Sequence, residues 1–171
     1  MKNIKNIGIF SAGRSDLGML KGIINDLNNS KSARLKIILG PAHFAKIFGR
    51  TFRELKELKN KNIKKIKFDL KNSSDKEILY YMSKIILNLK DQDYFRKLDA
   101  LVLLGDRYET FILSLVALVF KIKIIHLCGG SETEGSIDNI FRKFISECAY
   151  INLVETEKHK KNLLNIRNRK K

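Results

Sequence analysis

The chain has 171 residues, of which 44% are hydrophobic and 30% charged, which is enough apolar material for one folded domain. Its formal net charge is +16, from 34 Lys and Arg against 18 Asp and Glu. The composition excludes a disulfide-rich scaffold, since there are two cysteines, and a membrane span, since no apolar run approaches about 18 residues. The apolar stretch at residues 7–12 is too short for a signal sequence, so a cytoplasmic protein with reduced thiols is expected.

The positive charge leaves two interpretations open. So basic a balance can serve binding to nucleic acid or to a membrane surface. The lysines are scattered along the chain, however, and no arginine-rich helix stands out. We therefore favour a solvated, lysine-rich surface and expect neither a nucleic-acid nor a membrane partner.

A strand–helix unit opens the chain. A strand over residues 5–10 is followed by small and polar residues at 11–16, and then by a helix with Ser15 as its N-cap and apolar residues at helical spacing. The turn lacks the GxGxxG pattern of dinucleotide-binding proteins. Two interpretations stay open for it: a plain strand–helix turn, or an anion site at the N-terminal end of the helix.

The segment from residue 35 to residue 89 offers less chemistry. Its predicted elements are a strand, a helix, an exposed helix and loop, an alternating edge strand and a helix with a capping box, at residues 35–39, 42–48, 53–65, 66–70 and 73–89. The apolar stripe of the last helix is interpreted as core. His43 follows the second strand, where a histidine is more often a surface residue than a catalyst.

The chain is organised around residues 99–142. Two continuous apolar runs, at 101–104 and 122–127, predict strands that are covered on both faces, with a buried helix over 110–120 between them. A short strand and a last helix follow, so that six strand–helix units predict a doubly wound parallel α/β sheet of Rossmann type. Ligands bind such sheets beyond the carboxyl ends of the strands.

Polar residues at these strand ends are the candidates for chemistry. Asp106 and Asp138 each precede a helix, so each is either an N-cap or a carboxylate aimed at a ligand. Arg142 lies one turn after Asp138, as a helix pair or as a phosphate ligand. Two carboxylates, an arginine and a Gly-Gly turn at one edge favour a functional site. His126 and Cys128 share a strand face, but no acid is placed to orient them as a nucleophile pair, and a buried thiol is favoured.

Four segments of the chain match motifs of a known enzyme family. They are AGRSDLG at 12–18, Gly40 and His43 with FGRT at 48–51, LLGDRYE at 103–109, and HLCGGSETEGSIDNIFR at 126–142. The chain resembles the N-terminal half of the hydrolysing UDP-N-acetylglucosamine 2-epimerases of sialic and related nonulosonic acid synthesis. The resemblance implies one half of a glycosyltransferase-B-like fold, with UDP-N-acetylglucosamine or a related UDP-sugar bound in a cleft.

The resemblance also implies an activity and residue roles. Members of the family eliminate UDP with loss of the C2 proton and then add water, giving UDP and an N-acetylmannosamine-type sugar. Carried over, the catalytic positions are Asp106, Asp138 and Cys128, where the family usually has Glu or His in place of the cysteine. The substrate-binding positions are Arg14, Asp16, His43, Arg107, Gly129, Gly130 and Arg142. Neither a cofactor nor a metal is implied.

The resemblance fades near the end of the chain. We expect a single domain over residues 1–165 and a basic tail over 166–171, without the second domain of the family. Three hypotheses result: an epimerase that needs a second-domain chain or a homodimer, a non-catalytic remnant that binds a nucleotide-sugar, and a nucleic-acid-binding domain motivated by charge alone. The isolated chain is expected to be impaired, because half of a cleft enzyme cannot close around its substrate.

Overall fold

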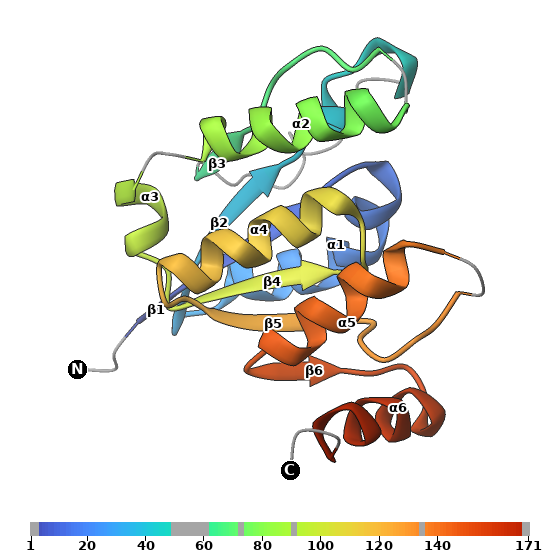
Figure 1. Ribbon diagram of the computed structural model, residues 1–171. Coiled ribbons are helices and arrows are strands. Elements are labelled where there is room, and N and C mark those ends of the chain that lie inside the picture. Colours follow the sequence, from blue (N-terminus) through green and yellow to red (C-terminus); the bar gives the residue numbers. More distant parts are fainter. Residues whose placement is uncertain (1–3, 49–61, 72–73, 90–91, 134–135, 169–171) are drawn as a thin grey trace.

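The structure is a computed structural model that describes residues 4–48, 62–71, 74–89, 92–133 and 136–168 (Figure 1). Within these residues a six-stranded sheet has the order β3-β2-β1-β4-β5-β6, and each neighbouring pair is parallel. The strands are β1 (Lys5–Ser11), β2 (Ala33–Leu39), β3 (Ile63–Lys65), β4 (Ala100–Leu104), β5 (Lys123–Leu127) and β6 (Ile151–Leu153).

Helices cover both faces of the sheet (Figure 1). One face packs against α1 (Arg14–Asn29), and the other against α2 (Asp75–Asn88), α3 (Gln92–Arg96), α4 (Tyr108–Val119) and α5 (Asp138–Cys148). The last helix, α6 (Glu157–Asn168), packs beside α5. The predicted doubly wound parallel α/β sheet is therefore confirmed.

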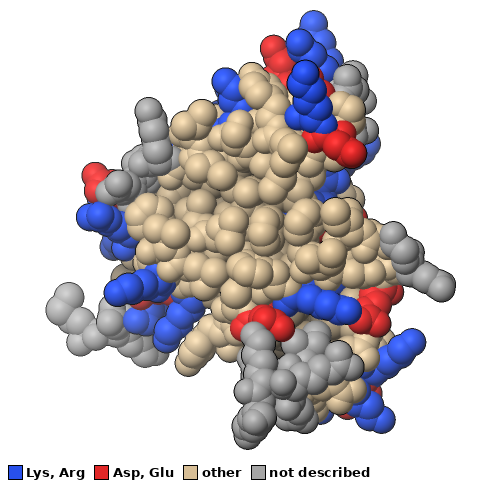
Figure 2. Space-filling view, viewed as in Figure 1, with Lys and Arg blue, Asp and Glu red and all other residues tan. Residues whose placement is uncertain are grey.

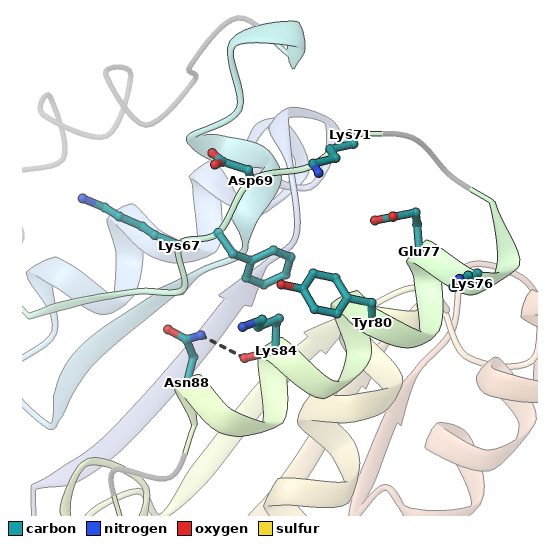
Figure 3. A pocket seen from close by; sticks show the side chains of 9 residues that line it. Lys67, Asp69, Lys71, Lys76, Glu77, Tyr80, Lys84 and Asn88 are labelled. Atoms are coloured by element: carbon teal, nitrogen blue, oxygen red, sulfur yellow. Dashed lines mark hydrogen bonds between the residues drawn. The ribbon is translucent and has the colours of Figure 1, made fainter.

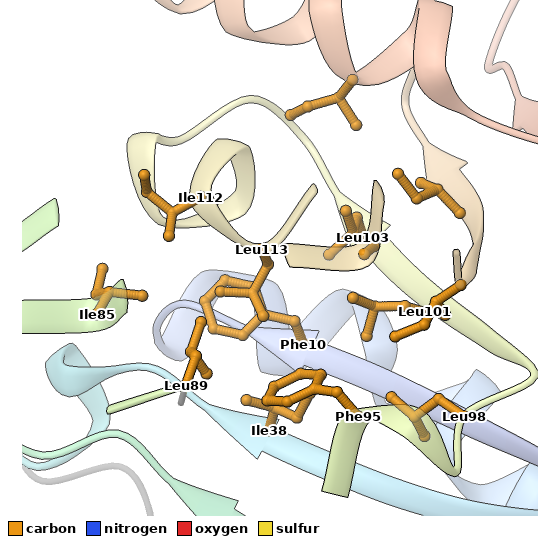
Figure 4. Close-up of a cluster of buried hydrophobic side chains, with 14 of the residues drawn as sticks. Phe10, Ile38, Ile85, Leu89, Phe95, Leu98, Leu101, Leu103, Ile112 and Leu113 are labelled. Carbon is orange, nitrogen blue, oxygen red and sulfur yellow. The ribbon is translucent and has the colours of Figure 1, made fainter. Parts of the chain in front are cut away.

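The continuous apolar runs explain why the sheet is central. All five residues of β4 are buried, and side chains that alternate along it enter the two opposite cores. Leu101 and Leu103 join Phe10 and Leu113 in the core beneath α2 and α4 (Figure 4), whereas Val102 packs in the core beneath α1. Full burial of each such side chain stabilises the fold by about 1.5–3 kcal/mol.

Two element predictions near β2 are wrong. Instead of one helix over residues 42–48, the chain forms two short 3-10 turns, Pro41–His43 and Lys46–Phe48. The edge strand is β3, since its residues pair with β2, while residues 66–70 have left the sheet after a last bond from the Ile66 N–H to the Leu39 carbonyl. The part of the predicted exposed helix and loop at residues 53–61 lies outside the described residues.

The helix caps also differ from the prediction. Ser15 is not an N-cap, because α1 begins at Arg14 and Gly13 is its N-cap. Ser74 is the N-cap of α2, but its hydroxyl makes no capping hydrogen bond. The side chain of Asp16, in the first turn of α1, instead accepts a hydrogen bond from the Ala12 N–H at 2.8 Å.

Two helices, α2 and α6, differ from the prediction in other respects. The apolar stripe of α2 is only partly core, because Ile85 is buried while Leu79 and Ile86 are 68% and 50% exposed. The last helix continues to Asn168, into the stretch expected as a tail. In the described ranges no helix is long and apolar enough to cross a membrane.

Candidate active site

The strand order reverses between β1 and β4. From β1 the sheet grows through β2 and β3 in one direction, and from β4 through β5 and β6 in the other. Ligands of open α/β sheets bind outside the carboxyl ends of the strands at such a switch point. The residues that follow β1, β4, β5 and β6 therefore define the candidate site.

An ion pair stands at the end of β4. Gly105 ends the strand with a positive φ of 70°, and the next residue, Asp106, accepts a hydrogen bond from Nη2 of Arg142 on α5. Nη1 of Arg142 donates to the Ser131 carbonyl at 2.7 Å, while its Nε is buried without a hydrogen-bond partner among the described residues. The arginine thus ties the loop after β5 to β4 and keeps one donor for a further acceptor.

Burial is the largest influence on the pKa of the Asp106 carboxyl group. Its side chain is 16% exposed, and this burial raises the pKa of the carboxyl group. Arg142 lowers that pKa, but Asp138 nearby raises it again, so the direction is upward. Carboxyl groups whose pKa is raised by burial beside other charged groups are common at sites of proton transfer.

The two predicted N-caps are placed differently. Asp106 is not an N-cap, because α4 begins at Tyr108 with Arg107 in that position. Asp138 is the first residue of α5, and its N–H bonds to the Ser136 hydroxyl at 3.2 Å. The Asp138 carboxylate lies near the positive N-terminal end of α5, where a negative charge is stabilising. The guanidinium of Arg142 bonds to the Asp106 carboxylate and to the Ser131 carbonyl.

His126 and Cys128 have different partners. His126 is fully buried, with Nε2 donating to the Gly105 carbonyl at 2.8 Å and Nδ1 3.0 Å from the Ser146 hydroxyl. Burial lowers the pKa of this imidazole. Cys128 follows β5 with a φ of 62°, and its thiol lies 3.4 Å from Oε1 of Glu155. No His–Cys nucleophile pair forms, because the left-handed turn at Cys128 breaks the strand alternation.

The Gly-Gly turn is required by packing. A Cβ on Gly129 would lie 2.8 Å from the Asn152 side-chain oxygen, and one on Gly130 would lie 2.3 Å from the His159 carbonyl oxygen. Gly130 also has a φ of 77° and accepts a hydrogen bond from the Asn162 side chain at 3.0 Å. The Gly-Gly turn therefore forms the surface against which α6 packs.

The end of β1 carries a second group of predicted residues. His43 is fully buried and shares a 2.9 Å hydrogen bond with the Ser11 hydroxyl, so its prediction as a surface residue is wrong. Asp16 is also buried and holds the turn through the Ala12 N–H. Arg14 is exposed at the start of α1. Buried hydrogen bonds of His43 and Asp16 thus hold the turn, while Arg14 is exposed.

Arg107 lies near both the residues that follow β1 and those that follow β4, since its charge interacts with Asp16 and with Asp106. Its guanidinium donates to both carboxylate oxygens of Glu109, at 2.8 and 3.1 Å. Burial alone would lower the pKa of Arg107, but the hydrogen bond and charge of Glu109 raise it above its usual range. Since the Glu109 side chain is fully buried, this pair fixes the arginine at the edge shared with Asp16.

The profile of a family described as UDP-N-acetylglucosamine 2-epimerase matches residues 25–171. The chain belongs to the UDP-N-acetylglucosamine 2-epimerase family. It is 35% identical over 162 residues to the GDP/UDP-N,N'-diacetylbacillosamine 2-epimerase (hydrolyzing) of Campylobacter jejuni, a match that covers 95% of this chain and 42% of the relative. It is 26% identical over 163 residues to the UDP-N,N'-diacetylbacillosamine 2-epimerase (hydrolyzing) of Legionella pneumophila, covering 95% and 43%.

Solved structures agree on the fold. The crystal structure of UDP-GlcNAc 2-epimerase from Neisseria meningitidis bound to UDP-GlcNAc matches with a TM-score of 0.75 at 23% identity, over 95% of this chain and 43% of that one. The expected architecture, one half of a glycosyltransferase-B-like fold, is confirmed. The chain spans about two fifths of the length of the curated relatives it matches.

The fold of this 2-epimerase family member collects most of the predicted residues. It brings together Asp106, Arg142, Cys128 and the Gly-Gly turn, and places Asp138 close enough to act on the Asp106 carboxyl. Sequence reasoning missed Glu109 and Glu155. Glu155 follows a predicted strand just as Asp106 does, so its position was a usable signal; the pairing of Glu109 with Arg107 could not be foreseen from spacing.

A separate hollow lies beyond β3 (Figure 3). It has a volume of about 650 Å³ and is lined by Lys67, Phe68, Asp69, Lys71, Lys76, Glu77, Tyr80, Lys84 and Asn88. The Lys84 ammonium sits 5.2 Å from the ring centre of Tyr80, and Asn88 donates to the Lys84 carbonyl. Its charged side chains are four lysines and two acids, without the convergence of buried polar groups found at the strand ends, which remain the candidate site.

No cluster of three His, Cys, Asp or Glu side chains suited to a metal ion occurs in the described part of the chain. Cys128 and Cys148 are not joined in a disulfide.

Proposed function

We propose that this chain supplies the N-terminal half of a hydrolysing UDP-sugar 2-epimerase. The enzyme would convert UDP-N-acetylglucosamine, or a diacetamido analogue, to UDP and a free N-acetylmannosamine-type sugar. The observation that carries the proposal is the pair of Asp106 and Arg142 at the sheet edge, in a chain of this family. The named activity of the 35% identical relative supports a diacetamido substrate.

The chemistry needs a proton acceptor and positive charge at separate points. Elimination removes the C2 proton to a base while the C1–O bond breaks and UDP leaves; water then adds across the resulting double bond. Asp106 is suited to the proton transfer because burial raises its pKa. The guanidinium of Arg142, whose buried Nε has no hydrogen-bond partner among the described residues, is suited to an oxygen of the departing diphosphate. Arg14, exposed at the start of α1, is a second cation for the same anion.

UDP release tests the proposal. The chain is incubated with UDP-N-acetylglucosamine and with its diacetamido analogue, alone and mixed with a polypeptide that carries the second domain of the family. We expect release in the mixture and a fall of about 10²–10⁴-fold with Asp106→Asn. Asp26→Asn, an exposed acid on α1, is the matched control and should keep the wild-type rate. If a folded wild-type chain releases no UDP in any mixture, the proposal is wrong.

A second candidate is a nucleotide-sugar-binding domain without turnover. The state of Cys128 favours it, because burial and Glu155 raise the pKa of the thiol to about 11, which leaves it protonated and unable to act as a base near neutrality. Calorimetric titration with UDP-N-acetylglucosamine separates the candidates. Binding without UDP release, in the presence of the second domain, would support this second candidate.

A broad uncharged surface suggests a quaternary role (Figure 2). It lies over α4 and the adjoining part of α2, where Val119 is 76% exposed, Leu79 68% and Ile86 50%. A shallow hollow of about 320 Å³ within it is lined by Ile86, Leu89, Ile112, Leu115, Val116, Val119 and Phe120. We call this surface the α2–α4 face. Apolar surface of this kind marks interaction sites.

A second copy of the chain is the proposed occupant of the α2–α4 face. With a net charge of +16, two copies repel wherever their lysines meet, and an uncharged surface avoids that repulsion. The face covers helices rather than the carboxyl ends of the strands, so a second domain that closes over the site would leave it free. We therefore propose a homodimer through α2 and α4.

A further inference from the structure

Glu155 lies at the carboxyl end of β6, on the same sheet edge as Asp106. Leu127 of β5 and Leu153 of β6 are register partners, and the Cys128 N–H bonds to the Leu153 carbonyl at 3.0 Å. This pairing brings the residues just beyond the two strands side by side. Glu155 is thus held at the edge by the sheet itself rather than by a distant loop.

The surroundings of Glu155 differ from those of three other acids in this region. Three carboxylates in this region face a lysine or an arginine: Asp106, Glu109 and Glu132. Glu155 instead has the Cys128 thiol 3.4 Å from Oε1 and Nδ1 of His159 3.6 Å from Oε2. Its side chain is 57% exposed. Glu155 is therefore accessible, and no ion pair with a lysine or an arginine holds it among the described residues, so its carboxyl oxygens can face a substrate.

His159 gives this arrangement a second titratable group. Its side chain is 20% exposed, and Nδ1 is buried without a hydrogen-bond partner among the described residues. It therefore faces Glu155 without a competing acceptor. The backbone is fixed too, because the His159 carbonyl lies against Gly130, where even a methyl group has no room.

The spacing of the strands fits a sugar between Asp106 and Glu155. Asp106 follows β4 and Glu155 follows β6, with β5 between them. Two strand spacings amount to about 10 Å, which is enough for a pyranose ring. Cys128, Gly129 and Gly130 follow β5, and none of the three carries a large side chain.

The proposed reaction needs two proton-transfer groups. In the elimination a carboxylate takes the C2 proton, the electron pair of the C–H bond forms the C1–C2 double bond, and UDP leaves with the electrons of the C1–O bond. In the hydration a second group, which has first taken up a proton from solvent, gives that proton to C2 from the opposite face, and it then regains a proton from the water whose oxygen bonds to C1. The first group then passes its proton to solvent. Inversion at C2 requires that the two groups lie on opposite sides of the ring.

We infer that Glu155 is the second proton-transfer residue of the site, with Asp106 as the first and the Cys128 thiol orienting the Glu155 carboxylate through its hydrogen bond. The inference rests on the proposed function. It assigns catalysis to a residue after β6 in place of the cysteine at the end of β5.

Kinetics of Glu155→Gln test the assignment. With UDP-N-acetylglucosamine and the second-domain polypeptide, we expect kcat for UDP release to fall by about 10²–10⁴-fold while KM stays nearly constant, since a proton-transfer group acts mainly in the transition state. Glu155→Asp should recover part of the rate. The matched control is Glu157→Gln, two residues along, where the side chain is 80% exposed and pairs with Lys160; it should keep the wild-type rate. Thermal melts establish that each variant folds.

The outcomes separate the two proposals. An active wild-type enzyme whose Glu155→Gln variant keeps its rate overturns the role of Glu155 and leaves the proposed function standing. A Glu155→Gln variant in which only KM changes overturns that role as well. A folded wild-type enzyme that releases no UDP overturns both proposals.

Discussion

Asp106 and Arg142 are 36 residues apart in the sequence, yet their ion pair joins the end of β4 to α5. The two side chains are only 16% and 11% exposed. Each charge is therefore compensated mainly by the other rather than by water, and the pair fixes both the site and the packing of α5 on the sheet.

Removing either partner should destabilise the fold, but by unequal amounts. Asp106→Ala leaves a guanidinium that cannot lose its charge, so we expect the free energy of unfolding to fall by about 3–5 kcal/mol. Arg142→Met should cost less, because Asp106, whose pKa burial already raises, can take up a proton. Urea denaturation measures both. Lys5→Ala, which breaks the exposed pair with Asp99, is the control and should cost under about 1 kcal/mol. Equal costs for all three would contradict the argument.

Gly130 should tolerate no side chain. Gly130→Ala combines a φ of 77° with a Cβ placed 2.3 Å from the His159 carbonyl oxygen, whereas Gly105→Ala has a φ of 70° and open space around the new methyl group. Both variants carry the backbone penalty of about 1–2 kcal/mol. Only Gly130→Ala adds a clash that displaces α6, so it should lose more stability and some helical circular dichroism. Matching losses in the two variants would mean that α6 does not depend on this turn.

The burial of His126 should make stability depend on pH. Burial lowers the pKa of His126 in the folded state below its ordinary value of 6.5, so the unfolded chain binds a proton first as pH falls. The stabilisation is present above about pH 6.5 and is lost as pH drops below it toward the folded pKa. Urea unfolding at several pH values should show a steeper decline between about pH 7 and 5 for the wild type than for His126→Gln. Parallel curves would refute this explanation.

Sequence reasoning succeeded where the signal is local. The apolar run of β4 identified a strand buried on both faces, the helical spacing of apolar residues identified α1, and a continuous apolar segment identified α4. Long-range pairing was not foreseeable: Arg142 has Asp138 one turn before it in the sequence but bonds to Asp106 from another strand end. His43 likewise is buried because its partner, Ser11, comes from β1.

The edge of the sheet was the least predictable part. The lysine-rich sequence of β3 lacks alternation, because an edge strand is held to β2 by backbone pairing and needs little apolar surface. The candidate site at the carboxyl ends of the strands was predicted in outline, with Asp106 and Arg142 among its residues. Glu155 was missed although it follows a predicted strand, and its contact with Cys128 could not be foreseen because it depends on β5 and β6 being neighbours.

The Cys128 thiol should report its contact with Glu155. In a Cys148→Ser background, alkylation by iodoacetamide at pH 8 should be about a hundredfold slower than for an ordinary thiol, because the pKa is raised from 9.0 to about 11. Glu155→Gln removes one cause of the raised pKa and should speed the reaction. Glu157→Gln should not. An unchanged rate in Glu155→Gln would show that the two side chains are not in contact in solution.

The α2–α4 face makes the last prediction. If two copies pair there, a charge on the exposed Val119 would be buried without a partner in the dimer, so Val119→Lys should shift the sedimentation coefficient from that of a dimer to that of a monomer. Met19→Lys is the matched control, because Met19 is 62% exposed on α1, on the opposite face of the sheet, and its substitution should leave the dimer intact. A wild-type chain that sediments as a monomer at high micromolar concentration would exclude this face as a dimer interface. Dissociation by both variants would instead point to non-specific association through exposed apolar residues.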